Sequence, residues 1–400
     1  MTQGRLSPLL VAIMAAATGL AVASNYYAQP LLPTIARAFG LSAAGAGFIV
    51  TTAQLGYGLG LLFLVPLGDL LERRALVVGM SLLTAAGLFI TASAPSIRVV
   101  LAGTALTGLF SVVVQVLVPF AASLAAPEER GKVVGTVMSG LLLGILLART
   151  VAGALANLGS WRIVYWVGGT CMLLMAAVLR RALPRHLEPA GLSYPQLMRS
   201  VAALFREEPV LRLRALLGGC TFAAFSVLWT SMGFLLAAPP YGCSPGTIGL
   251  FGLAGVAGAL AASGAGRMGD RGHGARVTGW GLGLLVVSWG FLALAGHSLA
   301  ALLAGILLLD LTSQGVHISN QAAIYRIRPE ARSRLTAGYM TAYFAGGAAG
   351  SLLSASAYQR AGWLGVVAVG TLMSLLGLGV WIVQAVRADS ASRPGAATEP

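Results

Sequence analysis

One carboxylic acid lies deep inside an apolar stretch of the chain and is the residue best placed to do chemistry. Asp310 follows Leu299 by eleven residues in a run of apolar side chains, whereas all the other acidic residues fall in polar segments or near the chain ends. In a helix, eleven residues correspond to about 16 Å, which is near the centre of a bilayer if the stretch crosses one. A lone carboxylate there costs at least about 2.5 kcal/mol, so we expect Asp310 to be protonated, paired or in contact with water.

Polar residues recur after Asp310 at helical spacing. Gln314, His317 and Gln321 follow it at i+4, i+7 and i+11 and would share one face of a helix. This stripe is predicted to line a cavity. An imidazole titrates near neutral pH, so His317 is a candidate proton carrier together with Asp310. The alternative for His317 is a hydrogen-bonded core residue.

A single basic residue, Arg149, also lies within an apolar stretch. Three interpretations are open. Its guanidinium group neutralises Asp310, or it binds an anionic substrate, or its long stem snorkels outward to the membrane surface.

Other polar and aromatic residues within apolar stretches are candidates for the wall of a substrate cavity. They are Asn25, Tyr26, Gln115, Trp229, Tyr339 and Tyr343. The alternative is packing, because aromatic residues in membrane helices are often packing residues or, as expected for Tyr27, part of an interfacial belt.

The composition indicates the elements that must hold these residues. Hydrophobic residues make up 57% of the 400 residues and charged residues only 10%, which is typical of a membrane protein. A soluble enzyme with one anchor is excluded because no polar stretch is long enough to fold into a domain. Apolar runs long enough to cross a bilayer number twelve. We predict them at 7-28, 45-66, 75-94, 99-123, 133-156, 162-181, 213-237, 246-265, 277-296, 299-324, 335-357 and 363-386. The long polar segment from about 180 to 214 is expected to be a loop.

The formal net charge of +14 predicts an orientation and does not require a nucleic-acid partner. Of the 26 basic residues, all but Arg37, Arg98, Arg149, Arg162 and Arg360 fall on one side of these spans. The positive-inside rule then places both termini in the cytoplasm. The three cysteines imply no disulfide framework.

The first apolar run has a second interpretation, a cleaved signal peptide with a small-residue site at Ala21-Val22-Ala23. Cleavage there would leave eleven spans and destroy an internal symmetry.

That symmetry is a repeat at a shift of about 202 residues. Gly40-Leu41-Ser42 falls on Gly242-Cys243-Ser244, Pro127-Glu128 on Pro329-Glu330, and Trp161 on Trp363. An even number of spans in each half gives the halves the same orientation, and parallel repeats place a substrate site between them. We therefore predict a six-helix bundle at 1-181, a cytoplasmic linker at 182-212, a second six-helix bundle at 213-386 and a tail at 387-400.

The loop after the second span carries a family resemblance. Gly68-Asp69-Leu70-Leu71-Glu72-Arg73-Arg74 is similar to the Asp-Arg-x-Gly-Arg-Arg signature of the major facilitator superfamily, and its copy at 266-276 contains Asp270 and Arg271. The first copy departs from the signature at Leu70 and Glu72. The resemblance implies an all-α fold of twelve transmembrane helices, in which Asp69, Arg73, Arg74, Asp270 and Arg271 form a conformational gate. The alternative for Arg73 and Arg74 is that they only set topology.

The resemblance also implies the function. We expect a secondary transporter, not an enzyme, in the bacterial plasma membrane, moving a small organic solute by alternating access with proton-coupled efflux. It would act as a monomer in the lipid bilayer without a cofactor or a metal ion.

The span with Gly140 and Gly144 lacks the Gly-Pro of drug-proton antiporters, so a packing role is expected for these glycines. The alternatives are proton-coupled uptake of a small, possibly anionic, nutrient and a non-transporting sensor on the same scaffold.

Overall fold

The computed structural model describes the chain except residues 1–5, 187–192, 256–273, 329–330 and 393–400. Within the described residues every regular element is helical. Nine helices in this part of the chain are long and apolar enough to cross a membrane, and two shorter apolar helices accompany them. The all-helical prediction is therefore confirmed.

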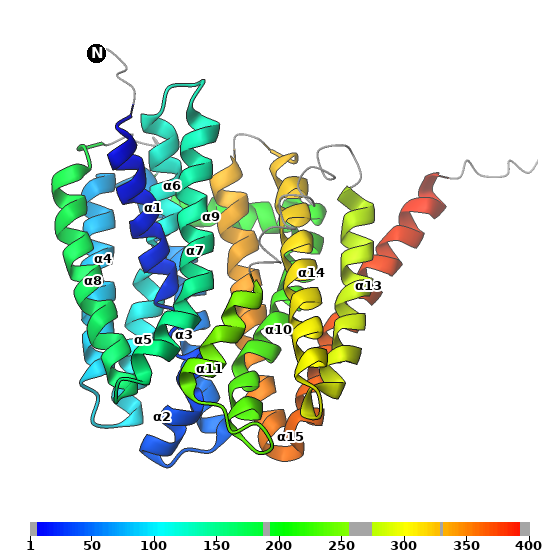
Figure 1. Ribbon diagram of the computed structural model, residues 1–400. Helices are drawn as coiled ribbons and strands as arrows, with labels where there is room; N and C mark the ends of the chain where they lie inside the picture. Colours follow the sequence, from blue (N-terminus) through cyan, green and yellow to red (C-terminus); the bar gives the residue numbers. More distant parts are fainter. Residues whose placement is uncertain (1–5, 187–192, 256–273, 329–330, 393–400) are drawn as a thin grey trace, which may run out of the picture.

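The first half of the chain forms a bundle in which consecutive spans run in opposite directions, whereas α1 and α7, which pack together, run parallel (Figure 1). Its elements are α1 (Pro8–Ala23), η1 (Gln29–Leu31), α2 (Leu32–Phe39), α3 (Ala43–Phe63), η2 (Val65–Asp69), α4 (Arg73–Ala92), α5 (Ile97–Phe110), α6 (Val113–Leu124), α7 (Arg130–Ala156) and α8 (Trp161–Ala182). Ser42 and Ser160 cap α3 and α8, and Gly40 ends α2 at φ 63°.

The second half follows a helical linker element, α9 (Tyr194–Glu207). Its elements are α10 (Pro209–Ala237), α11 (Pro245–Leu250), η3 (Phe251–Ala254), α13 (Gly274–Ala293), η5 (Leu294–Gly296), α14 (Leu299–Tyr325) and α15 (Arg332–Ser392). The long α15 contains a kink at Ala361 and Gly362 and so covers both of the last two predicted spans. In Figure 1, α1 begins and α15 ends toward the same end of the bundle.

The predicted spans coincide with helices but differ from them in several places. The first helix stops at Ala23, and the fourth is interrupted between Phe110 and Val113. The span at 246-265 is described only through residue 255, and α15 continues beyond residue 386. The count of twelve spans and the division into domains stay predictions.

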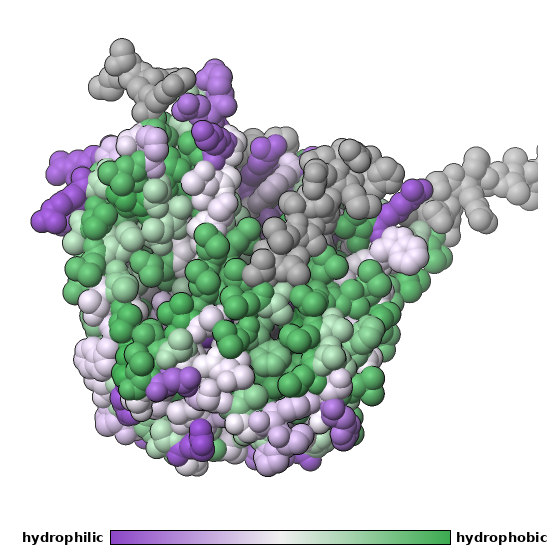
Figure 2. Space-filling view, in the orientation of Figure 1, coloured by the Kyte–Doolittle hydropathy of each residue, from purple (hydrophilic) through white to green (hydrophobic). Residues whose placement is uncertain are grey.

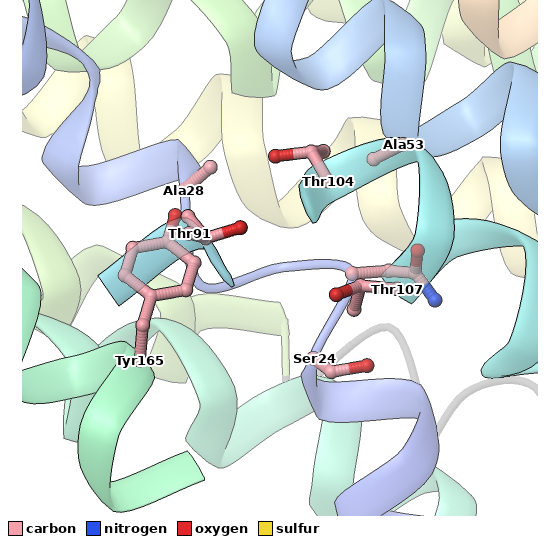
Figure 3. Close-up of a pocket in the computed structure, with 8 residues that line it drawn as sticks. Ser24, Ala28, Ala53, Thr91, Thr104, Thr107 and Tyr165 are labelled. Atoms are coloured by element: carbon pink, nitrogen blue, oxygen red, sulfur yellow. The ribbon is translucent and has the colours of Figure 1, made fainter. Parts of the chain in front are cut away.

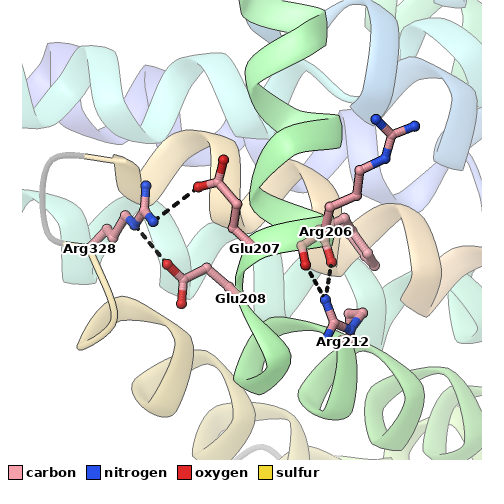
Figure 4. Close-up of polar contacts among 6 residues, drawn as sticks. Arg206, Glu207, Glu208, Arg212 and Arg328 are labelled. Carbon is pink, nitrogen blue, oxygen red and sulfur yellow. Dashed lines mark hydrogen bonds and ion pairs between the residues drawn. The ribbon is translucent and has the colours of Figure 1, made fainter.

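The expectation of a loop at 180-214 is wrong. Helix α9 is amphipathic, with Leu197, Val201 and Leu204 buried on one face. Figure 4 shows how it is tied to the second half: Arg328 contacts Glu207 at 3.1 Å and Glu208 at 2.7 Å. The ordering of this segment comes from its apolar face, because such exposed ion pairs contribute little.

Small residues bring helices together at matching places in the two halves. In the first half, a Cβ on Gly140 would lie 2.1 Å from the carbonyl oxygen of Ala15, and α7 therefore lies backbone to backbone against α1. In the second half, a Cβ on Gly350 would lie 2.3 Å from the carbonyl oxygen of Ala223 in α10. The packing role expected for Gly140 is confirmed. The burial of Met14 and Ala17 in α1 makes this helix part of the core.

The outer surface fits a bilayer. Large apolar side chains such as Leu143, Val151 and Leu174 are about half exposed or more. Figure 2 shows hydrophobic residues in a broad band, with hydrophilic residues gathered at the two ends of the bundle. A soluble protein would not leave so much apolar surface uncovered.

Candidate functional site

A cavity of about 540 Å³ lies between the two halves, at the end where α4 begins and α14 ends. Asp69, Arg73 and Gln115 line it from the first half. Gln321 and Tyr325 line it from the second half, and α9 adds Leu197 and Val201. The cavity therefore brings together residues that are far apart in the sequence.

At the opposite end the two halves are in direct contact. Thr150 Oγ1 donates to the carbonyl oxygen of Gly249 at 3.0 Å, and the N–H of Gly246 donates to Asn157 Oδ1 at 3.2 Å. On the other side, a Cβ on Gly47 would lie 2.2 Å from Cβ of Ala355. The structure is thus hollow at one end and packed at the other.

A buried charge cluster crosses the contact between the halves. Arg149 of α7 is 3% exposed, and its guanidinium carbon lies 3.7 Å from the ring centre of Trp229 in α10. Asp310 of α14 is 4% exposed and accepts the indole N–H of Trp229 at 3.2 Å. Trp229 therefore connects the two charges, one through its ring face and one through its N–H.

The donors of Arg149 are only partly used. Its Nε donates to Gln29 Oε1 at 2.5 Å, and Tyr26 lies under the guanidinium group at 5.0 Å. Nη2 is buried and has no hydrogen-bond partner among the described residues. Within the same residues no ion pair joins Arg149 to Asp310 at 4.0 Å or less. Because the side chain turns into the protein, the snorkelling alternative is wrong.

A small pocket of about 30 Å³ adjoins this cluster. Its lining includes Arg149, Asp310, Gln314 and Phe225. The polar face of α14 thus reaches the small pocket through Asp310 and Gln314 and the large cavity through Gln321.

A glycine stripe that the sequence analysis missed makes room for the two charges. Gly249, Gly252 and Gly255 recur every three residues, the period of the 3₁₀ turn that begins at Phe251. A Cβ on Gly252 would lie 2.9 Å from Cβ of Arg149, and one on Gly255 would lie 2.8 Å from Oδ2 of Asp310. The three-residue repeat was visible in the sequence as a signal for close approach.

His317 belongs to an aromatic group, apart from the charge cluster. Its Nδ1 is 3.0 Å from the hydroxyl oxygen of Tyr339, and its ring centre is 4.6 Å from that of Tyr343. Tyr343 in turn stacks on Phe222 at 4.1 Å. The structure therefore brings Tyr26, Trp229 and Arg149 together around Asp310, and Tyr339 and Tyr343 together around His317.

Asn25 lies elsewhere. Its Nδ2 donates to Ser111 Oγ at 2.6 Å, and it lines a pocket of about 10 Å³ inside the first half. Tyr165, Thr104 and Thr107 line the same pocket (Figure 3). The helix ends at Ala23, and the turn that follows directs Asn25 away from the space between the halves. The structure therefore places Asn25 in this small pocket and not in the lining of the cavity between the halves, which corrects the prediction.

The structure describes the gate residues expected in the loop after the second span, but not those of its copy in the second half. Arg73 is buried, with Nη1 donating to Ser123 Oγ at 3.0 Å, and Arg74 donates to the carbonyl oxygen of Leu183 at 3.4 Å. These contacts stay within the first half and the start of the linker. Asp270 and Arg271 lie outside the described residues.

Two sets of helices that enclose a cavity and meet at buried charges form the architecture of secondary transporters. The sequence profile of the Major Facilitator Superfamily matches residues 14–259 and 214–399. The chain is 64% identical to the transporter YgaY of Escherichia coli O157:H7 over 376 residues, which cover 94% of this chain and 95% of that protein. It is 33% identical over 386 residues to a Streptomyces coelicolor transporter, SCO4007, covering 96% and 89% of the two chains. The chain belongs to the Major Facilitator Superfamily.

The fold agrees with solved members of the family. A bacterial homologue of the human lysosomal transporter Spinster, in an inward-facing and occupied conformation, superposes with a TM-score of 0.78 at 14% identity, covering 97% of this chain and 98% of that chain. Its membership of the family makes this protein a multi-pass membrane transporter and not an enzyme.

Proposed function

We propose that this protein is a proton-coupled transporter of a small organic solute, with Asp310 as the proton-binding residue. The observation that carries the proposal is the cluster of Arg149, Trp229 and Asp310, which joins the two halves where they are in contact. An ionised Asp310 attracts Arg149 across this contact, and a protonated one does not. Proton binding therefore changes how firmly the halves are held together, which is the requirement for coupling.

The remaining residues have supporting roles in the proposal. Gln314, Gln321 and Gln115 line the path of the solute, with Tyr26, Tyr339 and Tyr343 as aromatic walls, and His317 is a second proton carrier. Asp69, Arg73 and Arg74, together with Asp270 and Arg271, control opening at the hollow end. The protein acts as a monomer in the bacterial plasma membrane with both termini in the cytoplasm.

The test is solute flux in proteoliposomes, with and without an imposed pH gradient, for a panel of organic acids, bases and neutral solutes. We expect Asp310→Asn to abolish the gradient-driven component and to retain exchange without a gradient. The matched control is Glu128→Gln, an exposed acid in the loop before α7, which should retain both. Unchanged gradient-driven flux in Asp310→Asn removes Asp310 as the coupling residue.

The direction of transport follows from the sign of proton movement in the same assay. Efflux, the direction implied by the resemblance to short bacterial efflux members, requires protons to move opposite to the solute. The alternative is uptake of an anion together with protons, and the unpartnered Nη2 of Arg149 is the observation that favours it. Absence of flux for every solute would instead support the sensor alternative.

A further inference from the structure

We propose that the cargo is a small organic anion whose carboxylate binds Arg149 while a proton occupies Asp310. The proposal rests on the function proposed above and adds the charge of the substrate and the sign of its coupling to protons. Its basis is the geometry of one buried arginine with one unused donor.

The first step is a count of charges in the small pocket. Arg149 stays protonated at any physiological pH. With Asp310 ionised, the charges of the two side chains sum to zero, and Trp229 contacts both of them. With Asp310 protonated, the buried guanidinium group has no counter-charge close to it among the described residues, and an unpaired buried charge is strongly unfavourable. An anionic solute supplies the missing charge in that state.

The second step is the geometry of the guanidinium group. Trp229 and Tyr26 lie along its faces and Gln29 accepts from Nε. The donor that is buried and unpartnered within the described residues is Nη2. A carboxylate is the acceptor that suits such a planar donor edge. Arg149 and Gln314 line a pocket of about 30 Å³, which has room for an acid group but not for a whole solute.

The third step concerns the rest of the solute. Beyond Gln314, the same face of α14 carries His317, which packs on Tyr343, and then Gln321 at the large cavity. A solute with an apolar or aromatic body would extend along this face from Arg149 toward the cavity of about 540 Å³. Access to Arg149 then comes from the hollow end.

The groups around Asp310 leave Arg149 as its dominant electrostatic partner. In the part of the chain that the structure describes, the titratable residues close enough to interact with Asp310 are Arg149 of α7, Tyr26 after α1 and Tyr343 of α15, with His317 two turns away on its own helix. The facing turn of η3 contributes Gly252 and Gly255, which carry no charge. The tyrosines are neutral at physiological pH, so the balance lies between Asp310 and Arg149.

The consequence is positive coupling between proton and anion. Two carboxylates that share one arginine repel each other, so binding of the anion favours protonation of Asp310. By reciprocity, protonation of Asp310 raises the affinity for the anion. Proton and cargo would then cross the membrane in the same direction, unlike the exchange made by a proton-drug antiporter.

The experiment is calorimetric binding to the purified full chain in detergent. The probes are benzoate, phenylacetate and lactate, each with its amide, and benzamidine as a cationic analogue of benzoate. We expect at least one acid to bind, more tightly at mildly acidic than at mildly alkaline pH, with proton uptake detected in buffers of different ionisation enthalpy. The amides and benzamidine should bind much more weakly.

Two variants separate the roles of the charges. Arg149→Gln should weaken binding of the acid by about ten- to hundred-fold, and Arg149→Lys, which keeps the charge, serves if the glutamine variant does not fold. Asp310→Asn should bind the acid without proton uptake and without pH dependence. Thermal unfolding of each variant confirms that it is folded.

The outcomes are distinct from those that test the function itself. Binding of none of the acids, equal binding of acid and amide, or unchanged acid binding in a folded Arg149→Gln protein overturns the proposed substrate class. Gradient-driven flux of a neutral or cationic solute that survives loss of Arg149 would overturn it too, while leaving proton-coupled transport intact. Acid binding with proton uptake but no gradient-driven flux would support the binding site and contradict the transport function.

Discussion

Glu72 shows how a departure from the family signature can have a structural reason at the scale of one residue. It stands where the signature has glycine, and its carboxylate accepts the backbone N–H groups of Arg74 and Ala75 at the start of α4. It also accepts the N–H of His186 at 3.2 Å. Burial alone would raise the pKa of Glu72, but these hydrogen bonds and the nearby Arg74 lower it below the ordinary value.

We predict that Glu72→Ala destabilises the protein in a pH-dependent way. Because the pKa is lowered in the folded state, the ionised carboxylate stabilises the fold above its unfolded pKa, and this is lost as the pH falls through the folded pKa. At neutral pH the loss of the cap should cost about 1 kcal/mol. Thermal unfolding over a pH series measures it, and Glu128→Ala is the exposed control. If the difference in unfolding temperature between Glu72→Ala and the wild type is the same at acidic as at neutral pH, this explanation is wrong.

The sequence predicted which residues are unusual but not how they meet. Asp310 and Arg149 stand out because charges are rare in apolar spans, and the structure places both next to the same indole. Trp229 was a candidate for the cavity wall, but its contact with both charges could not be predicted from the pattern. Gln29 was missed, because a residue near the end of a span carries no periodic signal, although it accepts the hydrogen bond from Arg149.

At the scale of elements, the contact between α7 and α11 controls the closed end. A Cβ on Gly249 would lie 2.4 Å from the carbonyl oxygen of Arg149, so α11 can approach α7 only because the side chain is absent. In the same way, a Cβ on Gly153 would lie 2.3 Å from the carbonyl oxygen of Pro245. The two helices are therefore held at backbone distance without any bulky side chain between them.

Gly249→Ala should open this end. The added methyl group disfavours the closed contact by about 1 to 3 kcal/mol, as overpacking does in other cores. Spin labels at Leu158 and Thr247, both exposed, should report longer distances after Cys171, Cys220 and Cys243 are replaced by serine. Gly283→Ala is the control, because a Cβ there meets no atom within 4 Å. Identical distance distributions in the two variants would rule out the steric explanation.

Helix α9 was not predicted from the sequence, which was interpreted as a loop in this segment. Its buried residues Leu197, Val201 and Leu204 follow a helical period, but the many arginines around them dominated the interpretation as a loop. The spacing of these three apolar residues by four and three positions is the signal of that buried helical face. The membrane helices were easier to predict, because a long apolar run in a membrane can satisfy its backbone hydrogen bonds in few structures other than a helix.

At the scale of the whole molecule, the orientation of the bundle remains a prediction that charge alone supports. The loop before α7 lies at the end of the bundle with α9, and the loop after α7 lies at the other. We predict that Leu158→Cys reacts in intact cells with a membrane-impermeant maleimide, and that Glu128→Cys reacts only after permeabilisation. The native cysteines are replaced by serine for this assay. The reverse labelling would invert the assigned orientation.

The repeat was the most informative whole-chain signal in the sequence. Its shift of about 202 residues relates Gly144 to Gly346, and the structure gives both the same kind of contact, with Gly19 and Gly219 respectively. What the repeat could not show is the asymmetry between the halves. Arg149 corresponds to Ser351 and Asp310 to Gly108, so each half supplies one charge that the other lacks.

The glycine stripe also sets the length of the route to the far side of the membrane. A Cβ on Gly249 would lie 2.4 Å from the carbonyl oxygen of Arg149, and from Arg149 the contact between α7 and α11 continues along α7 to Asn157. An acid held by Arg149 can reach the far side only when α11 separates from these two turns of α7. Discrimination between solutes must therefore be complete on the near side, along the polar face of α14.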